Sequence, residues 1–207
     1  MIRNFVRPPS SPSEYIADAV RLIGVLSVIS AAIWWTPTDV GILALAVPAS
    51  IVPRFVAARG GFDIVYGVVI LTAAWSNVLG LYETIPGWDI ALHFVCTGVI
   101  ASMTYLVLAE FRVVPSRANR GFSRRTAIVT TATAGLAVSA LWEMVEWFGH
   151  TFISKEIYVA YDDTIGDMAA GGVGALIAGI VVAAVRLVRP TPAEHQEDLI
   201  ARRRPLH

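Results

Sequence analysis

The sequence contains a single cysteine, Cys96, among 207 residues. One cysteine excludes an intramolecular disulfide and any zinc cluster built on cysteine thiolates, so we interpret Cys96 as a small packing residue. Charge of one sign is not in excess either, because 16 basic and 16 acidic residues balance to a net charge of zero. A balanced chain gives no indication of a nucleic-acid partner.

Charged residues as a whole are scarce, whereas apolar residues are abundant. Charged residues make up 15% of the chain and hydrophobic residues 56%, and the mean hydropathy is +0.63. Soluble globular domains are roughly 25% charged and 45–50% apolar. The long apolar runs therefore predict an all-α, polytopic membrane protein with one helical bundle. Residues 1–13 lack a short apolar stretch with a cleavage site, so we expect a retained tail and no signal peptide.

Six apolar segments are long enough to cross a membrane as helices. Pro48 and Pro53 predict a kinked or partial second helix. Asp18 and Arg21 in the first helix lie about one turn apart and are expected to pair or to reach the membrane interface. Ser13 is the expected N-cap of this helix. We expect helices over residues 14–35, 39–55, 62–84, 88–109, 126–148 and 163–188.

The arginines test both the number and the direction of these helices. With six helices, 14 of the 16 basic residues fall on one side, in the two tails and in the second and fourth loops. Because lysine and arginine are enriched on the cytoplasmic side, both termini are predicted to be cytoplasmic. We therefore expect a cytoplasmic tail (1–13), a six-helix transmembrane domain (14–189) and a second cytoplasmic tail (190–207).

Acidic and histidine side chains recur at helical spacing in the last three apolar segments. Glu143, Glu146 and His150 in the string ALWEMVEWFGH lie within an arc of about 60° on one helix. Two further pairs have i,i+4 spacing, Asp89 with His93 and Asp163 with Asp167. A charged residue in hydrocarbon costs roughly 3 kcal/mol on insertion scales, so such residues indicate a functional site.

The predicted topology places all seven groups in one layer of the outer leaflet. The fourth and sixth helices begin on the outer side, and the fifth ends there. Asp89 or Asp163 alone could be a helix N-cap, His150 could face water, and His93 could be a hydrogen-bonded core histidine. Glu143 and Asp167 lie in neither a first nor a last turn, so these alternatives do not explain them.

Carboxylates and imidazoles on facing helices are typical of a divalent-metal site. Such ligands suit Zn, Mn or Fe, and five close acids cannot all ionise without cations or shared protons. Glu143 and Glu146 are the candidate catalytic residues. The predicted metal ligands are Asp89, His93, Glu143, Glu146, His150, Asp163 and Asp167.

Small residues follow the same helix faces. Gly135 and Ser139 share a stripe with Glu143, and Gly171 and Gly179 belong to a small-residue row in the last helix. Small residues let helix backbones approach closely. We expect these faces to form the helix contacts, although ordinary membrane-helix packing also produces this pattern.

The strings WDIALHFVCTG, ALWEMVEWFGH and YDDTIGDMAAGGVGAL resemble the bacterial YjdF-type integral-membrane family. The order of the His, Glu and Asp-x-x-x-Asp motifs is more distantly similar to VanZ-like proteins, which are associated with glycopeptide resistance and the cell envelope. The resemblance implies a location in the bacterial cytoplasmic (inner) membrane. It supports the positions of the site residues, but the YjdF-type family has no established activity to carry over.

Two functions of different class fit these residues. The first is a metal-dependent enzyme at the outer face that acts on a lipid or lipid-linked envelope substrate, with a spare carboxylate as general base. The second is a proton- or cation-linked carrier or binding protein without catalysis. A purely structural cluster is a third alternative. The lack of an internal repeat and of matching acids in the inner leaflet favours the enzyme. The lipid bilayer is the expected partner, and the sequence does not indicate an oligomeric state.

Overall fold

The computed structural model describes residues 1–155, 157 and 159–190. Beyond Pro190, the predicted C-terminal tail lies outside these residues. The described part contains six helices that are long and apolar enough to cross a membrane, which confirms the predicted all-α polytopic class. These are α2 (Pro12–Trp34), α3 (Pro37–Phe55), α4 (Gly60–Val78), α6 (Trp88–Glu110), α7 (Arg124–Phe152) and α8 (Tyr161–Ala184). Two one-turn helices, α1 (Ile2–Phe5) and α5 (Leu81–Thr84), precede α2 and α6.

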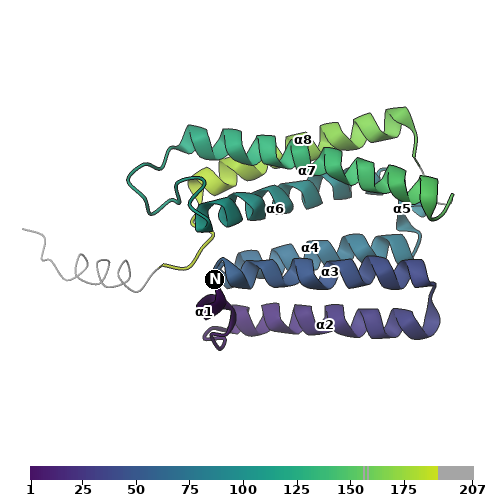
Figure 1. Ribbon diagram of the computed structural model, residues 1–207, viewed down its shortest axis with the longest axis horizontal. Helices are drawn as coiled ribbons and strands as arrows, with labels where there is room; N and C mark the ends of the chain where they lie inside the picture. Colours follow the sequence, from purple (N-terminus) through teal and green to yellow (C-terminus); the bar gives the residue numbers. More distant parts are fainter. Residues whose placement is uncertain (156, 158, 191–207) are drawn as a thin grey trace, which may run out of the picture.

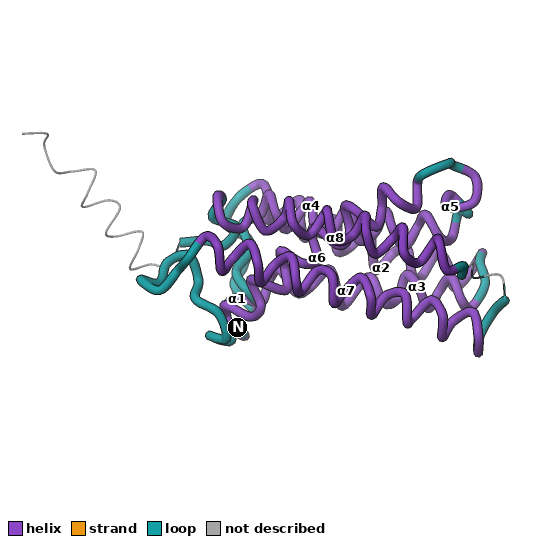
Figure 2. The backbone as a smooth tube through the Cα atoms, turned by 90° about the horizontal axis from the view of Figure 1, so that it is seen from above, coloured by secondary structure: helices purple, strands orange, loops and turns teal. Residues whose placement is uncertain are grey.

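The long helices form two groups of three, α2–α4 and α6–α8 (Figure 1). Within each group every helix contacts the other two, whereas the groups meet mainly through α4 and α6. All six run along one axis, with the loops gathered at its two ends (Figure 2). We call the end that carries the N-terminus the proximal end, and it comprises residues 1–11, 56–59, 111–123 and 185–190. The other, distal end comprises residues 35–36, 79–87 and the described part of 153–160.

The first helix begins two residues earlier than expected, and Ser13 is not its N-cap. Pro12 is the first residue of α2, and Ser11 is the N-cap. Proline is favoured at this position because its φ is already helical and it has no N–H to leave unsatisfied. The next helix, α3, includes both Pro48 and Pro53 without interruption.

The third apolar segment is divided into two helices. α4 ends at Val78, and Gly80 has a left-handed φ of 62° before the single turn of α5. Glycine adopts this conformation readily because it has no β-carbon. The chain therefore turns before α6, where an uninterrupted helix to Thr84 was expected.

The sixth helix ends at Ala184, four residues before the expected end, because the following residues pair with the α3–α4 loop. The Arg59 N–H donates to the Leu187 carbonyl at 2.8 Å, and the Arg189 N–H donates to the Ala57 carbonyl at 2.9 Å. These bonds satisfy backbone groups that would otherwise lie unpaired beyond the helix. They also join the two helical groups at the proximal end.

Small residues bring α6, α7 and α8 into close contact, as their spacing predicted. A β-carbon on Gly174 would overlap the Phe94 carbonyl, and one on Gly179 would lie 2.9 Å from the Ile128 carbonyl oxygen. Only glycine allows backbones to approach this closely. The acidic stripes of the three helices consequently face one another across short distances.

Candidate metal centre

His93 lies at the centre of the predicted site, on α6. Its side chain is only 9% exposed. The Nε2 atom is 3.3 Å from Asp89 Oδ1, one turn earlier in the same helix, and the Nδ1 atom is 3.7 Å from Glu143 Oε1 on α7. The two ring nitrogens thus face carboxylates from two different helices.

Two overlapping groups of side chains each place three ligand atoms within 4.8 Å of one another. Asp89, His93 and Asp167 form one group, and His93, Glu143 and Glu146 form the other. His93 belongs to both, and the five residues come from α6, α7 and α8. Bonds of about 2.0–2.2 Å to one ion bring ligand atoms roughly 3–4 Å apart, so small side-chain movements would close either group around a cation.

Two buried oxygens in this cluster accept no hydrogen bond from any described residue. They are Glu143 Oε1 and Asp167 Oδ1, on side chains that are 8% and 2% exposed. A buried polar group without a partner costs about 1–3 kcal/mol, and a charged group costs more. A cation bound in either group would supply the missing interaction to the buried carboxylate of that group, Asp167 in the first or Glu143 in the second.

Glu146 lies one turn closer to the distal end than Glu143 and is half-buried. Its carboxylate accepts a hydrogen bond of 2.8 Å from the indole Nε1 of Trp142. Trp142 itself is 48% exposed. The indole therefore orients this carboxylate at the edge of the cluster.

Asp89 and Asp163 are not helix caps, because the N-cap residues are Gly87 for α6 and Ala160 for α8. Asp89 belongs to the cluster. Asp163 is half-buried one turn before Asp167 and is outside both groups of ligand atoms. It lies one turn closer to the distal end, so a direct bond to an ion at His93 would require rearrangement.

His150 is not brought into the cluster. Its Nδ1 lies 2.5 Å from the carbonyl oxygen of Ile157, in the connection between α7 and α8. α7 continues to Phe152, one turn beyond the expected end, and this turn carries His150 to the connection. Of the seven predicted ligands, the structure therefore gathers five, Asp89, His93, Glu143, Glu146 and Asp167.

On the proximal side of the cluster, the adjacent turn of each helix forms a polar layer, which we call the polar floor. Thr97, Ser139 and Gly171 each lie four residues nearer the proximal end than one of the three buried ligands. A β-carbon on Gly171 would lie 2.7 Å from Ser139 Oγ and 2.8 Å from Thr97 Oγ1, so both hydroxyls face this glycine. Ser139 Oγ is buried and has no hydrogen-bond partner among the described residues. The sequence indicated Ser139 only as a packing residue and gave no signal for Thr97.

An apolar layer closes the space below this floor. It consists of Ala101, Gly135 and Ala175, one further turn toward the proximal end. Both alanines are 0% exposed. A β-carbon on Gly135 would lie 2.9 Å from that of Ala101 and would overlap that of Ala175. No hydrated ion fits between three helices packed this tightly, so this layer blocks a path from the cluster toward the proximal end.

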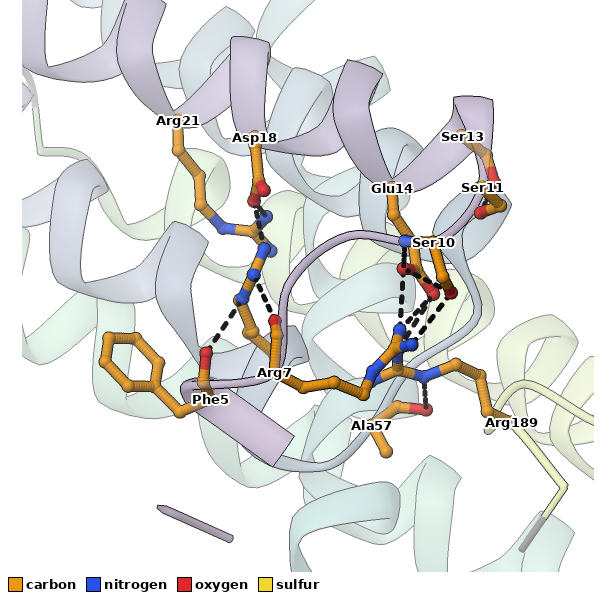
Figure 3. Close-up of polar contacts among 11 residues, drawn as sticks. Phe5, Arg7, Ser10, Ser11, Ser13, Glu14, Asp18, Arg21, Ala57 and Arg189 are labelled. Atoms are coloured by element: carbon orange, nitrogen blue, oxygen red, sulfur yellow. Dashed lines mark hydrogen bonds and ion pairs between the residues drawn. The ribbon is translucent and has the colours of Figure 1, made fainter. Parts of the chain in front are cut away.

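A second charged cluster lies at the proximal end of the first helical group (Figure 3). Asp18 and Arg21 pair at 2.8 Å, as the sequence predicted. Arg21 Nη2 also donates to Asp63 Oδ1 at 2.5 Å, and Asp63 on α4 is 8% exposed. We expected no acids in the inner leaflet to match the outer ones, and Asp63 is a buried acid at the proximal end that is already paired with an arginine. The sequence gave no signal for Asp63 because its partner lies on another helix.

Similarity to one known protein family extends over most of the chain. A family model described as "Predicted membrane protein (DUF2238)" matches residues 17–187. Neither the curated proteins nor the solved structures give a match. The matched region contains every residue of the distal cluster and the Asp18, Arg21 and Asp63 cluster. Because most of the chain is matched, this protein belongs to the DUF2238 family of predicted membrane proteins.

Proposed function

We propose that the protein is a metal-dependent membrane enzyme with a divalent ion at the distal end. His93 would hold the ion together with Asp89 and Asp167 in one group or with Glu143 in the other, and Glu146 lies at the edge. The observation that carries this proposal is the pair of buried, unpartnered carboxylate oxygens of Glu143 and Asp167 around one imidazole. Zn, Mn or Fe suits this mixture of carboxylate and imidazole ligands.

A bound ion supplies a Lewis acid that activates water or polarises a phosphoryl or carbonyl group. Glu146 is the candidate general base, because it is half-buried, lies one turn nearer the distal end than Glu143 and is oriented by the Trp142 indole. Glu143 lies deeper and would act as a ligand. The side chains of Trp147 and Phe152 near the opening are 54% and 65% exposed. Aromatic side chains concentrate at membrane interfaces, which supports a lipid or lipid-linked envelope substrate.

A carrier is the alternative function, and the apolar layer argues against it. An ion that enters from the distal end meets Ala101, Gly135 and Ala175, which leave no continuation through this helical group. Asp63 at the proximal end is already paired with Arg21. We also propose that the protein lies in the bacterial inner membrane, with its distal end on the outer side. The similarity to YjdF-type and VanZ-like proteins remains a prediction from the sequence.

Elemental analysis of the full chain, purified without chelator, tests the metal. We expect about one equivalent of Zn, Mn or Fe in the wild type and a clear loss in His93→Ala, because a central ligand disappears. His150→Ala is the matched control and should keep its metal, because His150 contacts the Ile157 carbonyl instead. Wild-type protein that binds none of the three metals, or equal metal in both variants, would contradict the proposal.

A further inference from the structure

A cavity of about 320 Å³ lies between α2 and α3, near the proximal end and away from the metal centre. Its walls combine three charged side chains with a set of aliphatic ones. The charged residues are Asp18, Arg21 and Arg54, and the aliphatic residues are Val25, Val47 and Ile51. No step of the proposed reaction uses this cavity.

The charged and aliphatic walls are separated along the helix axes. In α2 the chain runs from Asp18 and Arg21 to Val25 as it leaves the proximal end. In α3 it runs from Val47 to Arg54 as it returns. The charged groups therefore lie nearer the proximal surface, and the aliphatic walls extend toward the middle of the membrane. Val25 is 43% exposed, so this aliphatic part is accessible from the side of the helical group.

The charged end of the cavity has N–H donors that no described residue engages. Arg21 donates to Asp18, Asp63 and the Ser50 carbonyl. Each of these bonds uses a different nitrogen of the guanidinium. A guanidinium carries five N–H groups, so two remain that no described residue engages. Phosphate oxygens fit such donors well, often two at a time.

Arg54 is the second guanidinium in the wall, and its bonds leave donors in the same way. It donates to the Phe5 and Arg7 carbonyls at 3.1 and 2.7 Å and pairs with Asp18. Phe5, Arg7 and Asp18 lie around the Arg54 guanidinium, and Figure 3 draws these contacts. The donors of both arginines thus border the charged end of the cavity.

Asp18 and Asp63 balance Arg21 and Arg54 beside the cavity, so the excess positive charge at this end of the molecule comes from the proximal loops. In the proximal loops, residues 1–11, 56–59, 111–123 and 185–190, every charged side chain is an arginine. Basic pockets between membrane helices bind anionic lipid headgroups, and basic surfaces attract anionic lipids generally. A free phosphate ion would satisfy the guanidiniums but would leave the aliphatic walls bare. A phospholipid has the same polarity as the cavity, with its charge at the surface and its chains toward the membrane middle.

We propose that this cavity binds one anionic phospholipid of the leaflet at the proximal end. Its phosphate contacts Arg21 and Arg54, and one acyl chain lies along Val25, Val47 and Ile51. Phe5, which stacks on Phe55 with ring centroids 4.6 Å apart, borders the headgroup. This site is independent of the metal centre and of the proposed reaction.

Native mass spectrometry of the full chain with added phosphatidylglycerol or phosphatidylcholine tests this site. We expect the wild type to retain one phosphatidylglycerol, at least about fivefold in preference to phosphatidylcholine. Val25→Phe fills the aliphatic wall at a position exposed enough to accept the larger ring, and it should abolish this retention. Leu22→Phe, on the same helix at a side chain that is 58% exposed and outside the cavity, should keep it.

Three results would overturn the proposal. They are equal retention of the two lipids, unchanged retention in Val25→Phe, and release of the phosphatidylglycerol by millimolar inorganic phosphate. The last result would assign the arginines to free phosphate. Arg54→Gln provides a second variant, with circular dichroism to verify that its helices persist. A folded Arg54→Gln variant that keeps the wild-type lipid preference would also refute the role of the guanidinium.

Discussion

Glu143 and Asp167 differ from the other acids of the distal cluster in both burial and hydrogen bonding. Each has an oxygen that accepts no hydrogen bond from a described residue, although the side chains are 8% and 2% exposed. The more exposed Glu146 has the Trp142 indole as a donor. A cation bound beside these two deep acids would therefore stabilise charge that their unbonded oxygens leave without a partner.

Replacement of Glu143 by Gln should lower both the metal content and the thermal stability. The neutral amide removes one ligand, so the binding free energy of the ion adds less to the folded state. A loss of about 1–3 kcal/mol would lower the unfolding midpoint by roughly 2–4 °C per kcal/mol in a chain of this length. Thermal unfolding in one detergent, combined with elemental analysis, measures both effects.

Glu83→Gln is the control for this substitution, because Glu83 is exposed on α5 and outside both groups of ligand atoms. It should keep the wild-type midpoint and metal content. A wild type that melts at the same temperature with and without a chelator, together with an unchanged Glu143→Gln, would instead indicate that the acids share protons.

At the scale of the element, the contact among α6, α7 and α8 sets the position of the metal centre. Successive turns of these helices present the ligands, then Thr97 and Ser139, then the tight layer around Gly135. A change in one turn therefore displaces the ligands on the distal side of that turn. Packed interiors transmit such displacements because they contain little free volume.

Gly171→Ala tests this coupling. The added methyl group would lie 2.7 Å from Ser139 Oγ and 2.8 Å from Thr97 Oγ1, so the helices must separate slightly. We expect a destabilisation of about 1–3 kcal/mol and weaker metal binding. Titration of the stripped protein with Zn²⁺, followed by thermal unfolding, measures both.

Gly166→Ala on the same helix is the matched control. Its β-carbon would meet only Ile90 Cδ1, at an ordinary distance of 3.5 Å, so stability and metal affinity should stay close to those of the wild type. Equal Zn²⁺ affinity in the two variants would mean that the polar floor does not position the ligands.

For the whole molecule, the sequence predicted the helices well and their ends less well. The six membrane-spanning helices were predicted from the length of the apolar runs alone. This signal lies in the local composition of the chain. The early end of α8 depends on hydrogen bonds to residues 57–59, and such distant pairing leaves no local signal. In the site, helical spacing identified His93, Glu143 and Asp167, whereas the contact of His150 with a loop carbonyl could not be read from the sequence.

The orientation in the membrane remains a prediction, and reporter fusions test it. A reporter fused after Arg120, in the proximal α6–α7 loop, should be cytoplasmic because the proximal loops carry the arginines. A reporter fused near Lys155, at the distal end, should report the outer side. The reverse result at both positions would turn the metal centre toward the cytoplasm and exclude an envelope substrate for it.

The backbone pairing between residues 57–59 and 187–189 has a consequence for biosynthesis. The ribosome completes α2, α3 and α4 long before it reaches Leu187, so this first group can pack while the rest of the chain is still being translated. Until then, the Arg59 N–H and the Ala57 carbonyl have only water as a partner at the membrane surface. The bonds to Leu187 and Arg189 close after α8 has been inserted. A nascent chain that stalls before this point would therefore present an open edge to insertion factors and quality-control proteases, whereas a finished chain would not.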